Sequence, residues 1–139
     1  MAMVETFRGV GFPWLTDQMG HLTTSRYLEM FDVAAYHLAH RIGLGHRPAE
    51  QVGLADVRHE IDYRAEVPLG GLVLIRSGVL KSGTSSFRAR HVMTDADGET
   101  VHAVLEAVTV RFDLAARSAT PLPAGFAERC APYLAEQAA

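Results

Sequence analysis

The sequence is poor in the features of secreted, membrane-spanning or nucleic-acid-binding proteins. Its one cysteine, Cys130, cannot form an internal disulfide, which is typical of a protein from a reducing compartment. Uninterrupted apolar runs are short, such as Leu72–Ile75, whereas a membrane-spanning helix needs about 20 apolar residues. The first residues lack the apolar stretch of a secretory signal. We therefore expect a soluble, cytoplasmic protein with no membrane partner.

The sequence also lacks a strongly basic charge, a reactive cysteine context and a metal-binding pattern. The formal net charge is −3, so the chain has no overall basic footprint for nucleic acid. Cys130 has no His or Asp context that marks a nucleophile, and we expect a small buried apolar residue. Among the 7 histidines, His37 and His40 lie one helical turn apart, but no Glu or Cys completes a metal set. We predict no metal and no other cofactor.

A period of three to four residues predicts one long amphipathic helix from about Thr24 to Ile42. Gly43 and Gly45 follow it and are suited to ending a helix. The apolar stripe consists of Tyr27, Met30, Phe31, Ala34, Leu38 and Ile42. A single helix of this kind must bury its stripe against a sheet.

Five other segments have strand patterns. The longest alternation runs from Ala55 to Val67, with Ala55, Val57, His59, Ile61 and Tyr63 on one face and Asp56, Arg58, Glu60 and Asp62 on the other. The remaining strands are expected at residues 5–14, 72–80, 85–94 and 99–112, and a short helix at 126–137. Short turns between strands favour antiparallel neighbours. The 139 residues therefore predict one α+β domain, in which a curved five-stranded antiparallel sheet surrounds one helix.

Asp17 is the strongest candidate for chemistry. It lies a few residues before the predicted helix, whose start presents unpaired N–H groups and a partial positive charge. Such N–H groups can hold a carbonyl oxygen during acyl transfer, and Gly20 lets the backbone approach a substrate closely. Asp17 would then act as a base on water or as a nucleophile. The alternative from the residues alone is that Asp17 only caps the helix.

The residues around Asp17 also carry a recognisable motif. Residues 17–22 read Asp-Gln-Met-Gly-His-Leu, and residues 27–31 read Tyr-Leu-Glu-Met-Phe. This resembles the signature of the hot-dog-fold acyl-CoA thioesterases, and most closely that of the 4-hydroxybenzoyl-CoA thioesterase family. The resemblance continues in order through residues 61–63, 68–70, 83–85, 97–98 and 120–123.

The resemblance implies a fold, a reaction and an assembly. The fold is a helix wrapped by the sheet, and two chains pair edge to edge as a homodimer or a dimer of dimers, with the active site between them. The reaction is hydrolysis of an acyl-CoA thioester to a free acid and coenzyme A. Asp17 would be nucleophile or general base, backbone N–H groups near Gly20 and His21 would polarise the carbonyl, and Tyr27 would shape the pocket.

The chain departs from this family where many members carry two Asn or a His, since Thr23 and Thr24 stand there. Thr24 is a candidate substrate contact, and this departure leaves the acyl group open. Two alternatives to catalysis also stay open. One is a non-catalytic acyl-CoA-binding hot-dog module, and the other is a structural partner in a larger assembly.

Several histidines and carboxylates are weaker candidates. The side chain of His21 could polarise substrate or water, although packing against its loop is the plainer interpretation. His59 and His91 have apolar phases in their strands and are expected as hydrogen-bonded core residues. His59 is also a substrate-binding candidate, because its strand lines the pocket in the family. On the helix, Glu29 and Asp32 are expected to be solvated or interface charges.

Coenzyme A would bring phosphate groups that need basic partners. Arg88 and Arg90 lie two residues apart on one strand face, with Lys81 and the hydroxyl of Ser85 near the preceding turn. We consider Ser85, Arg88 and Arg90 as coenzyme A contacts. The alternative is that the two arginines are solvated strand charges.

Overall fold

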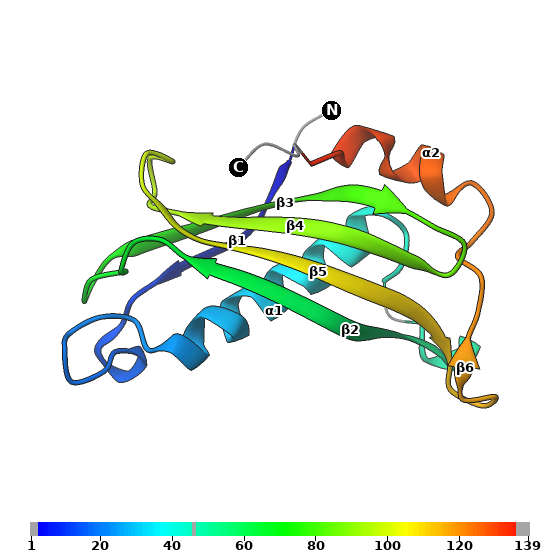
Figure 1. Cartoon of the computed structure of the whole chain (residues 1–139), viewed down its shortest axis with the longest axis horizontal. Helices are drawn as coiled ribbons and strands as arrows, with labels where there is room; N and C mark the ends of the chain where they lie inside the picture. The colour runs from blue at the N-terminus through cyan, green and yellow to red at the C-terminus, as the bar shows by residue number, and fades with distance from the viewer. Residues whose placement is uncertain (1–2, 46, 136–139) are drawn as a thin grey trace.

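An antiparallel sheet curves around one long helix in the computed structural model, which describes residues 3–45 and 47–135 (Figure 1). The strand order across the sheet is β1-β3-β4-β5-β2, and the short strand β6 pairs with β5. This confirms the predicted α+β architecture. The elements are β1 (Val4–Val10), α1 (Thr24–Arg41), β2 (Val52–Tyr63), β3 (Leu72–Ser82), β4 (Ser86–Thr94), β5 (Val101–Asp113), β6 (Ser118–Ala119) and α2 (Phe126–Cys130).

Helix α1 has the boundaries and the buried face that its periodicity predicts. All six residues of the predicted stripe are buried. The helix ends because Gly43 adopts a left-handed backbone, with a φ of 83°. The N–H groups of Gly43 and Leu44 donate to the carbonyls of His40 (3.2 Å) and Ala39 (2.8 Å), which satisfies the last turn of the helix.

The core has two parts along α1. The larger part surrounds the first half of the helix and includes Phe31, Ile75 and Met93, which are fully buried. The smaller part surrounds the helix end, where α2 adds Phe126 and Cys130. Burial raises the pKa of the Cys130 thiol to about 11, so it stays protonated near neutral pH. Cys130 is thus the small buried residue that was expected.

The main differences from the predicted boundaries lie in β1, β2 and the terminal helix. Strand β2 covers Val52–Tyr63 rather than residues 55–67. Strand β1 ends at Val10 rather than at residue 14, because the N–H of Gly11 turns to the carbonyl of Gly71 (2.8 Å) and a 3-10 turn begins at Pro13. The terminal helix covers only Phe126–Cys130, and a 3-10 turn follows at Ala131–Tyr133, where Pro132 removes a backbone donor. The rest of its predicted range, from residue 136, lies outside the described residues.

The predicted faces of β2 are wrong over its first half, because the strand contains a β-bulge. Asp56 pairs with Thr109 and Arg58 with Val108, so Val57 has no partner of its own across the ladder. An extra residue of this kind reverses which side chains face inward. Asp56 therefore faces the helix side with Thr109, whereas the sequence pattern puts it on the opposite face.

The sheet gives the molecule two ends that matter for the site. At the loop end, residues 11–22 and 67–71 meet beside the start of β3. At the far end, α1 finishes near α2 and the turn between β3 and β4 (Figure 1). Within the described residues, none of the helices is long and apolar enough to cross a membrane.

Candidate active site

The segment between β1 and α1 forms a tight loop around Asp17. The N–H of Asp17 donates to the carbonyl of His21 (2.9 Å), and the N–H of Gly20 donates to the carbonyl of Asp17 (3.0 Å). Gly20 has a φ of 79°, which is the left-handed backbone that the turn requires. The loop is docked on the segment before β3, where Leu69 donates to the carbonyl of Gly20 (2.9 Å).

The two carboxylate oxygens of Asp17 have different surroundings. Oδ1 accepts hydrogen bonds from the N–H groups of Met19 (2.9 Å) and His21 (3.3 Å). Oδ2 has no hydrogen-bond partner in residues 3–45 and 47–135, and the side chain is only partly buried. One oxygen therefore fixes the orientation of the carboxylate while the other is available to a substrate or water. Asp17 does not cap α1, because its Oδ1 accepts from Met19 and His21, and the N-cap residue is Thr23, whose side chain makes no capping hydrogen bond.

The backbone N–H groups predicted as carbonyl donors have hydrogen-bond partners in this structure. The N–H groups of Gly20 and His21 are occupied within the loop, by the backbone carbonyl and the Oδ1 atom of Asp17. The N–H groups of Thr24 and Ser25, at the start of α1, have no such partner within the described part of the chain. These two N–H groups are therefore available as donors at the start of α1.

Two predicted site residues near the loop have supporting contacts. The Nε2 atom of His21 lies 3.5 Å from a carboxylate oxygen of Glu66, and its ring has no hydrogen bond to Asp17 among the described residues. Tyr27 is buried under the loop and packs edge-on against Tyr63, with ring centroids 5.1 Å apart. Burial raises the pKa of the Tyr27 hydroxyl, against an opposing hydrogen bond with the Val67 backbone. Tyr27 thus supports the loop from below.

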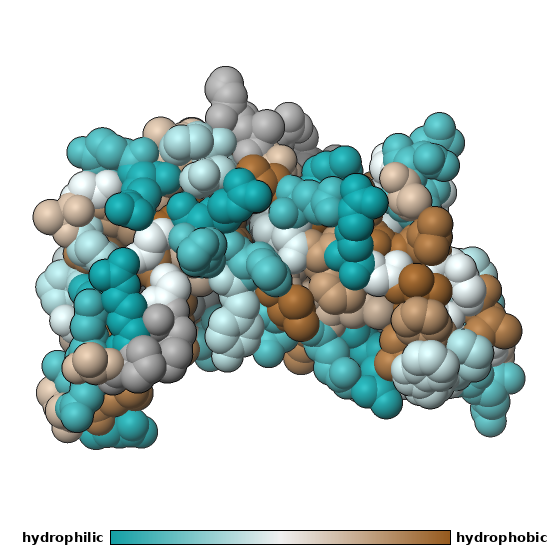
Figure 2. All heavy atoms as spheres, turned by 180° about the vertical axis from the view of Figure 1, so that it is seen from behind, coloured by the Kyte–Doolittle hydropathy of each residue, from teal (hydrophilic) through white to brown (hydrophobic). Residues whose placement is uncertain are grey.

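Exposed apolar side chains surround the Asp17 loop. Phe12 and Trp14 stack with their ring centroids 4.6 Å apart, and Trp14 and Met19 are each 70% exposed. Leu69 adds a further exposed side chain from the neighbouring turn. In the view from behind, hydrophobic atoms gather at the end of the molecule that carries this loop (Figure 2). Such a surface suits contact with an apolar ligand or a second chain.

A cavity of about 650 Å³ lies at the far end, between the second half of α1 and strands β2, β4 and β5. This volume is in the range of small-molecule sites, about 300–1,000 Å³. It exists because alanines face one another across it, Ala35 and Ala39 on α1 and Ala89 and Ala107 on the sheet. Its polar lining includes Asp56, His91 and Thr109, and its charged lining includes Asp32 and the arginines Arg47, Arg111 and Arg129.

These polar residues include one that the sequence did not single out. Asp56 accepts a hydrogen bond from the hydroxyl of Thr109 (2.8 Å), and its other oxygen lies 3.2 Å from Nε2 of His59. The bulge at Val57 turns Asp56 inward, and no local sequence signal marks that bulge. His59 is partly exposed rather than a core residue, whereas His91 is 1% exposed as expected.

The candidate coenzyme A contacts lie apart from Asp17 within one chain. Ser85 is in the turn between β3 and β4, and its carbonyl accepts from the N–H of Arg111 (2.8 Å). Arg88 lies 3.1 Å and Arg90 3.9 Å from carboxylate oxygens of Glu106. Both arginines face away from α1. The structure therefore brings together Asp17, Gly20, His21, Thr24 and Tyr27, and separates them from His59, Ser85, Arg88 and Arg90.

Comparison with known proteins assigns the family. Residues 10–130 match the model of the thioesterase-like superfamily, and the chain belongs to this family. The predicted thioester hydrolase class is thereby confirmed. No curated protein sequence matches the chain.

Solved structures share the fold over most of its length. A thioesterase candidate from Pseudomonas putida is 25% identical with a TM-score of 0.80, over 96% of this chain and 86% of that one. A protein from Staphylococcus aureus solved in complex with CoA is 17% identical with a TM-score of 0.85, over 96% and 85%. A 1,4-dihydroxy-2-naphthoyl-CoA thioesterase from Synechocystis is 18% identical with a TM-score of 0.79, over 92% and 95%. These likenesses confirm the hot-dog fold.

Proposed function

We propose that the protein hydrolyses an acyl-CoA thioester to a free acid and coenzyme A, with Asp17 as the reacting carboxylate. The observation that carries this is the anchored Oδ1 and available Oδ2 of Asp17 in a family of thioester hydrolases. The similar structures named as CoA thioesterases, or solved with CoA, support coenzyme A as the thiol.

Two routes fit the position of Asp17. As a nucleophile, Oδ2 attacks the thioester carbon, the C–S bond breaks with release of the coenzyme A thiolate, and water then hydrolyses the resulting anhydride. As a general base, Oδ2 takes a proton from water, whose oxygen attacks the same carbon, and the C–S bond then breaks to release the coenzyme A thiolate. In both routes the carbonyl oxygen gains negative charge, which the N–H groups of Thr24 and Ser25 would stabilise.

We further propose that two chains form the site. Strand β2 is an edge of the sheet, with no neighbour on its outer side in the described residues, and Val57 is 62% exposed there. Antiparallel pairing of two β2 edges would complete both ladders. Tyr63, at one end of β2, lies beside the helix start, while Val52, at the other end, lines the cavity.

Such pairing places the Asp17 loop of one chain at the cavity of its partner, since the two ends of β2 exchange places. Within one chain, the loop and the cavity are separated by about the first half of α1, whose 18 residues span about 27 Å in all. Ser85, Arg88 and Arg90 also lie toward the far end of their own chain. In the pair they are expected near the partner's loop, where they would meet coenzyme A phosphates.

The test measures thiol release from a panel of acyl-CoA thioesters. We expect Asp17→Asn to lower kcat by roughly 100-fold or more, because general-base or nucleophilic catalysis is lost. Asn can still accept the two N–H groups at Oδ1, so the loop is retained. Asp113→Asn is the matched control, because Asp113 Oδ1 likewise accepts two backbone N–H groups, from Ala115 and Ala116.

Full activity in Asp17→Asn would exclude the catalytic assignment. Coenzyme A binding without turnover of any panel member would favour the alternative, a non-catalytic acyl-CoA-binding module. We include this alternative because the N–H groups of Gly20 and His21, which were predicted to polarise the carbonyl, already have hydrogen-bond partners in the loop.

A further inference from the structure

The bulge in the edge strand β2 places an aspartate and a histidine on the same side of the sheet. Residues three apart on a regular strand face opposite sides. The extra residue at Val57 changes this, so that Asp56 and His59 both face α1. Their partners across the ladder are Thr109 and Ala107. Bulges of this kind are common next to active sites, where they redirect a side chain.

Asp56 holds the ring of His59 in one direction. Its Oδ1 atom accepts a hydrogen bond from the hydroxyl of Thr109 (2.8 Å), and its Oδ2 atom lies 3.2 Å from Nε2 of His59. A carboxylate can only accept, so Nε2 carries the ring proton. In the neutral ring Nδ1 is then a base, and it has no hydrogen-bond partner in residues 3–45 and 47–135. The pair therefore has the arrangement in which a third group orients a catalytic base.

The pair lies beside the cavity, in a space that suits one water molecule. Asp56 and His59 line a hollow of about 10 Å³ between β2 and α1, together with Leu28 and Asp32 of the helix. Asp56 and Asp32 also line the 650 Å³ cavity, so the two spaces are adjacent. The side chains of His59 and Asp56 are 30% and 35% exposed, so water can reach both. The two carboxylates would stabilise the positive charge of a His59 ring that has taken up a proton.

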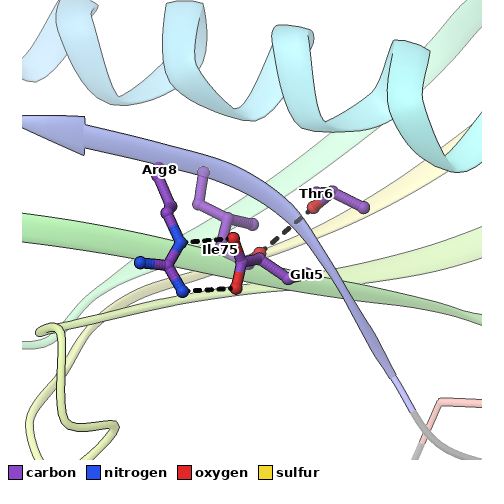
Figure 3. A network of polar contacts seen from close by, with 4 residues as sticks. All are labelled: Glu5, Thr6, Arg8 and Ile75. Carbon is purple, nitrogen blue, oxygen red and sulfur yellow. Dashed lines mark hydrogen bonds and ion pairs between the residues drawn. The ribbon is translucent and has the colours of Figure 1, made fainter.

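His91 borders the same hollow but is a poor base. It is 1% exposed, and its Nδ1 atom lies 2.5 Å from the hydroxyl of Ser77. The hydroxyl of Ser77 lies 2.8 Å from that of Thr6, which donates in turn to the carbonyl of Ile75 (3.3 Å; Figure 3). Desolvation lowers the pKa of His91 to about 4, so this ring takes up a proton only in acid. His59 is therefore the histidine of the hollow that can exchange protons with water.

We propose that His59 activates the water that releases the acyl group from Asp17. This rests on the proposed function in its nucleophilic form, in which the acyl group lies in the cavity and is joined as an anhydride to the partner's Asp17. Nδ1 of His59 takes a proton from water, the water oxygen attacks the acyl carbon, and the bond from that carbon to Oδ2 breaks. The products are the free acid and the restored Asp17 carboxylate, and His59 returns its proton to solvent. Asp56 is a positioning residue, because it keeps the ring proton on Nε2.

The test separates thiol release from hydrolysis of the anhydride, with a thioester that the wild type cleaves. In His59→Gln, Asp17 still attacks the thioester, so stopped-flow detection should show a burst of about one thiol per site. The steady state that follows should be roughly 100-fold slower than in the wild type, because a general base is lost. Mass spectrometry of the acid-quenched protein should find the acyl group on the chain, and peptide mapping should place it on Asp17.

Three variants control this result. His37→Gln is the matched control, because His37 is an exposed histidine of α1 that lines neither the cavity nor the hollow, and it should behave as the wild type. Asp56→Asn should give the same burst as His59→Gln, since an amide no longer fixes the proton on Nε2. His59→Ala should regain turnover when imidazole is added to the solution, which a purely structural role of His59 would not allow.

The outcomes separate this proposal from the catalytic role of Asp17. If His59→Gln keeps the wild-type kcat, or if its kcat falls without a burst and without an acylated chain, the role of His59 is overturned while Asp17-dependent cleavage stands. If neither His59 variant folds, Asp56→Asn decides, and the absence of a burst there overturns the proposal. If the wild type releases no thiol from any panel member, the proposed function fails and the role of His59 fails with it.

Discussion

The side chain of Asp17 is held by its own loop, which explains how a partly exposed carboxylate can have a defined direction. Its loop depends on Gly20, whose left-handed backbone costs other residues about 1–2 kcal/mol. Sequence alone could identify Asp17 and Gly20, because the motif is local. It could not show that the N–H groups of Gly20 and His21 are occupied, because that depends on how the loop closes.

Gly20→Ala tests the loop directly. A Cβ at Gly20 would meet nothing within 4 Å, so the loss in the free energy of unfolding should be only the backbone term of about 1–2 kcal/mol. Gly70→Ala is the matched control, with the same φ of 79° and the same open surroundings. Urea unfolding should give similar losses for both variants, whereas thiol release should fall only in Gly20→Ala. Equal rates of thiol release in Gly20→Ala and Gly70→Ala would show that the geometry of the Gly20 turn does not affect catalysis.

His91 predicts an acid dependence of stability. Its pKa is about 4 in the folded chain and near 6.5 when unfolded, so the unfolded state binds the extra proton between these values. The free energy of unfolding is therefore unaffected by His91 above pH 6.5 and falls by about 3 kcal/mol as the pH drops from 6.5 to 4. The free energy of unfolding, measured by urea at each pH, should fall less steeply between pH 6.5 and 4 in His91→Phe than in the wild type. An equally steep fall in both proteins would contradict the burial of a neutral His91.

At the scale of elements, the sequence predicts the long helix correctly and the two faces of the longest strand only in part. The helix pattern from Thr24 to Ile42 predicts α1 correctly, since its stripe and its Gly43 stop are encoded locally. The alternation of β2 was wrong before Val57, because the bulge depends on the register with β5. That register aims Asp56 into the cavity, so this half of the candidate site could not be predicted from the pattern alone.

We predict that two chains associate through the exposed edge of β2. Val57→Lys places a charge on this edge, and we expect it to shift the protein toward monomers, as measured by sedimentation velocity. Val57 is 62% exposed, so the fold itself should be little affected. Leu72→Lys, on β3 and 55% exposed, should leave the assembly intact. If the Val57→Lys assembly has the same mass in solution as the wild-type assembly, the interface does not lie at the β2 edge.

At the scale of the whole molecule, the chain has the Asp17 carboxylate at one end and its cavity at the other. The order of strands and the single helix could be predicted from the sequence. The separation could not, because it depends on the length of α1 and on the small side chains around its second half. If the proposed function is right, a working site combines Asp17 of one chain with the cavity of another.

Mixing two inactive variants tests this requirement most directly. Asp17→Asn removes the carboxylate and keeps the cavity, while Ala35→Trp fills the cavity wall and keeps Asp17. Each alone should be nearly inactive in thiol release. After subunit exchange, half of the pairs are mixed and each holds one intact site, so about a quarter of wild-type activity should return. An activity no higher than the sum of the two separate variants would contradict a site shared between chains.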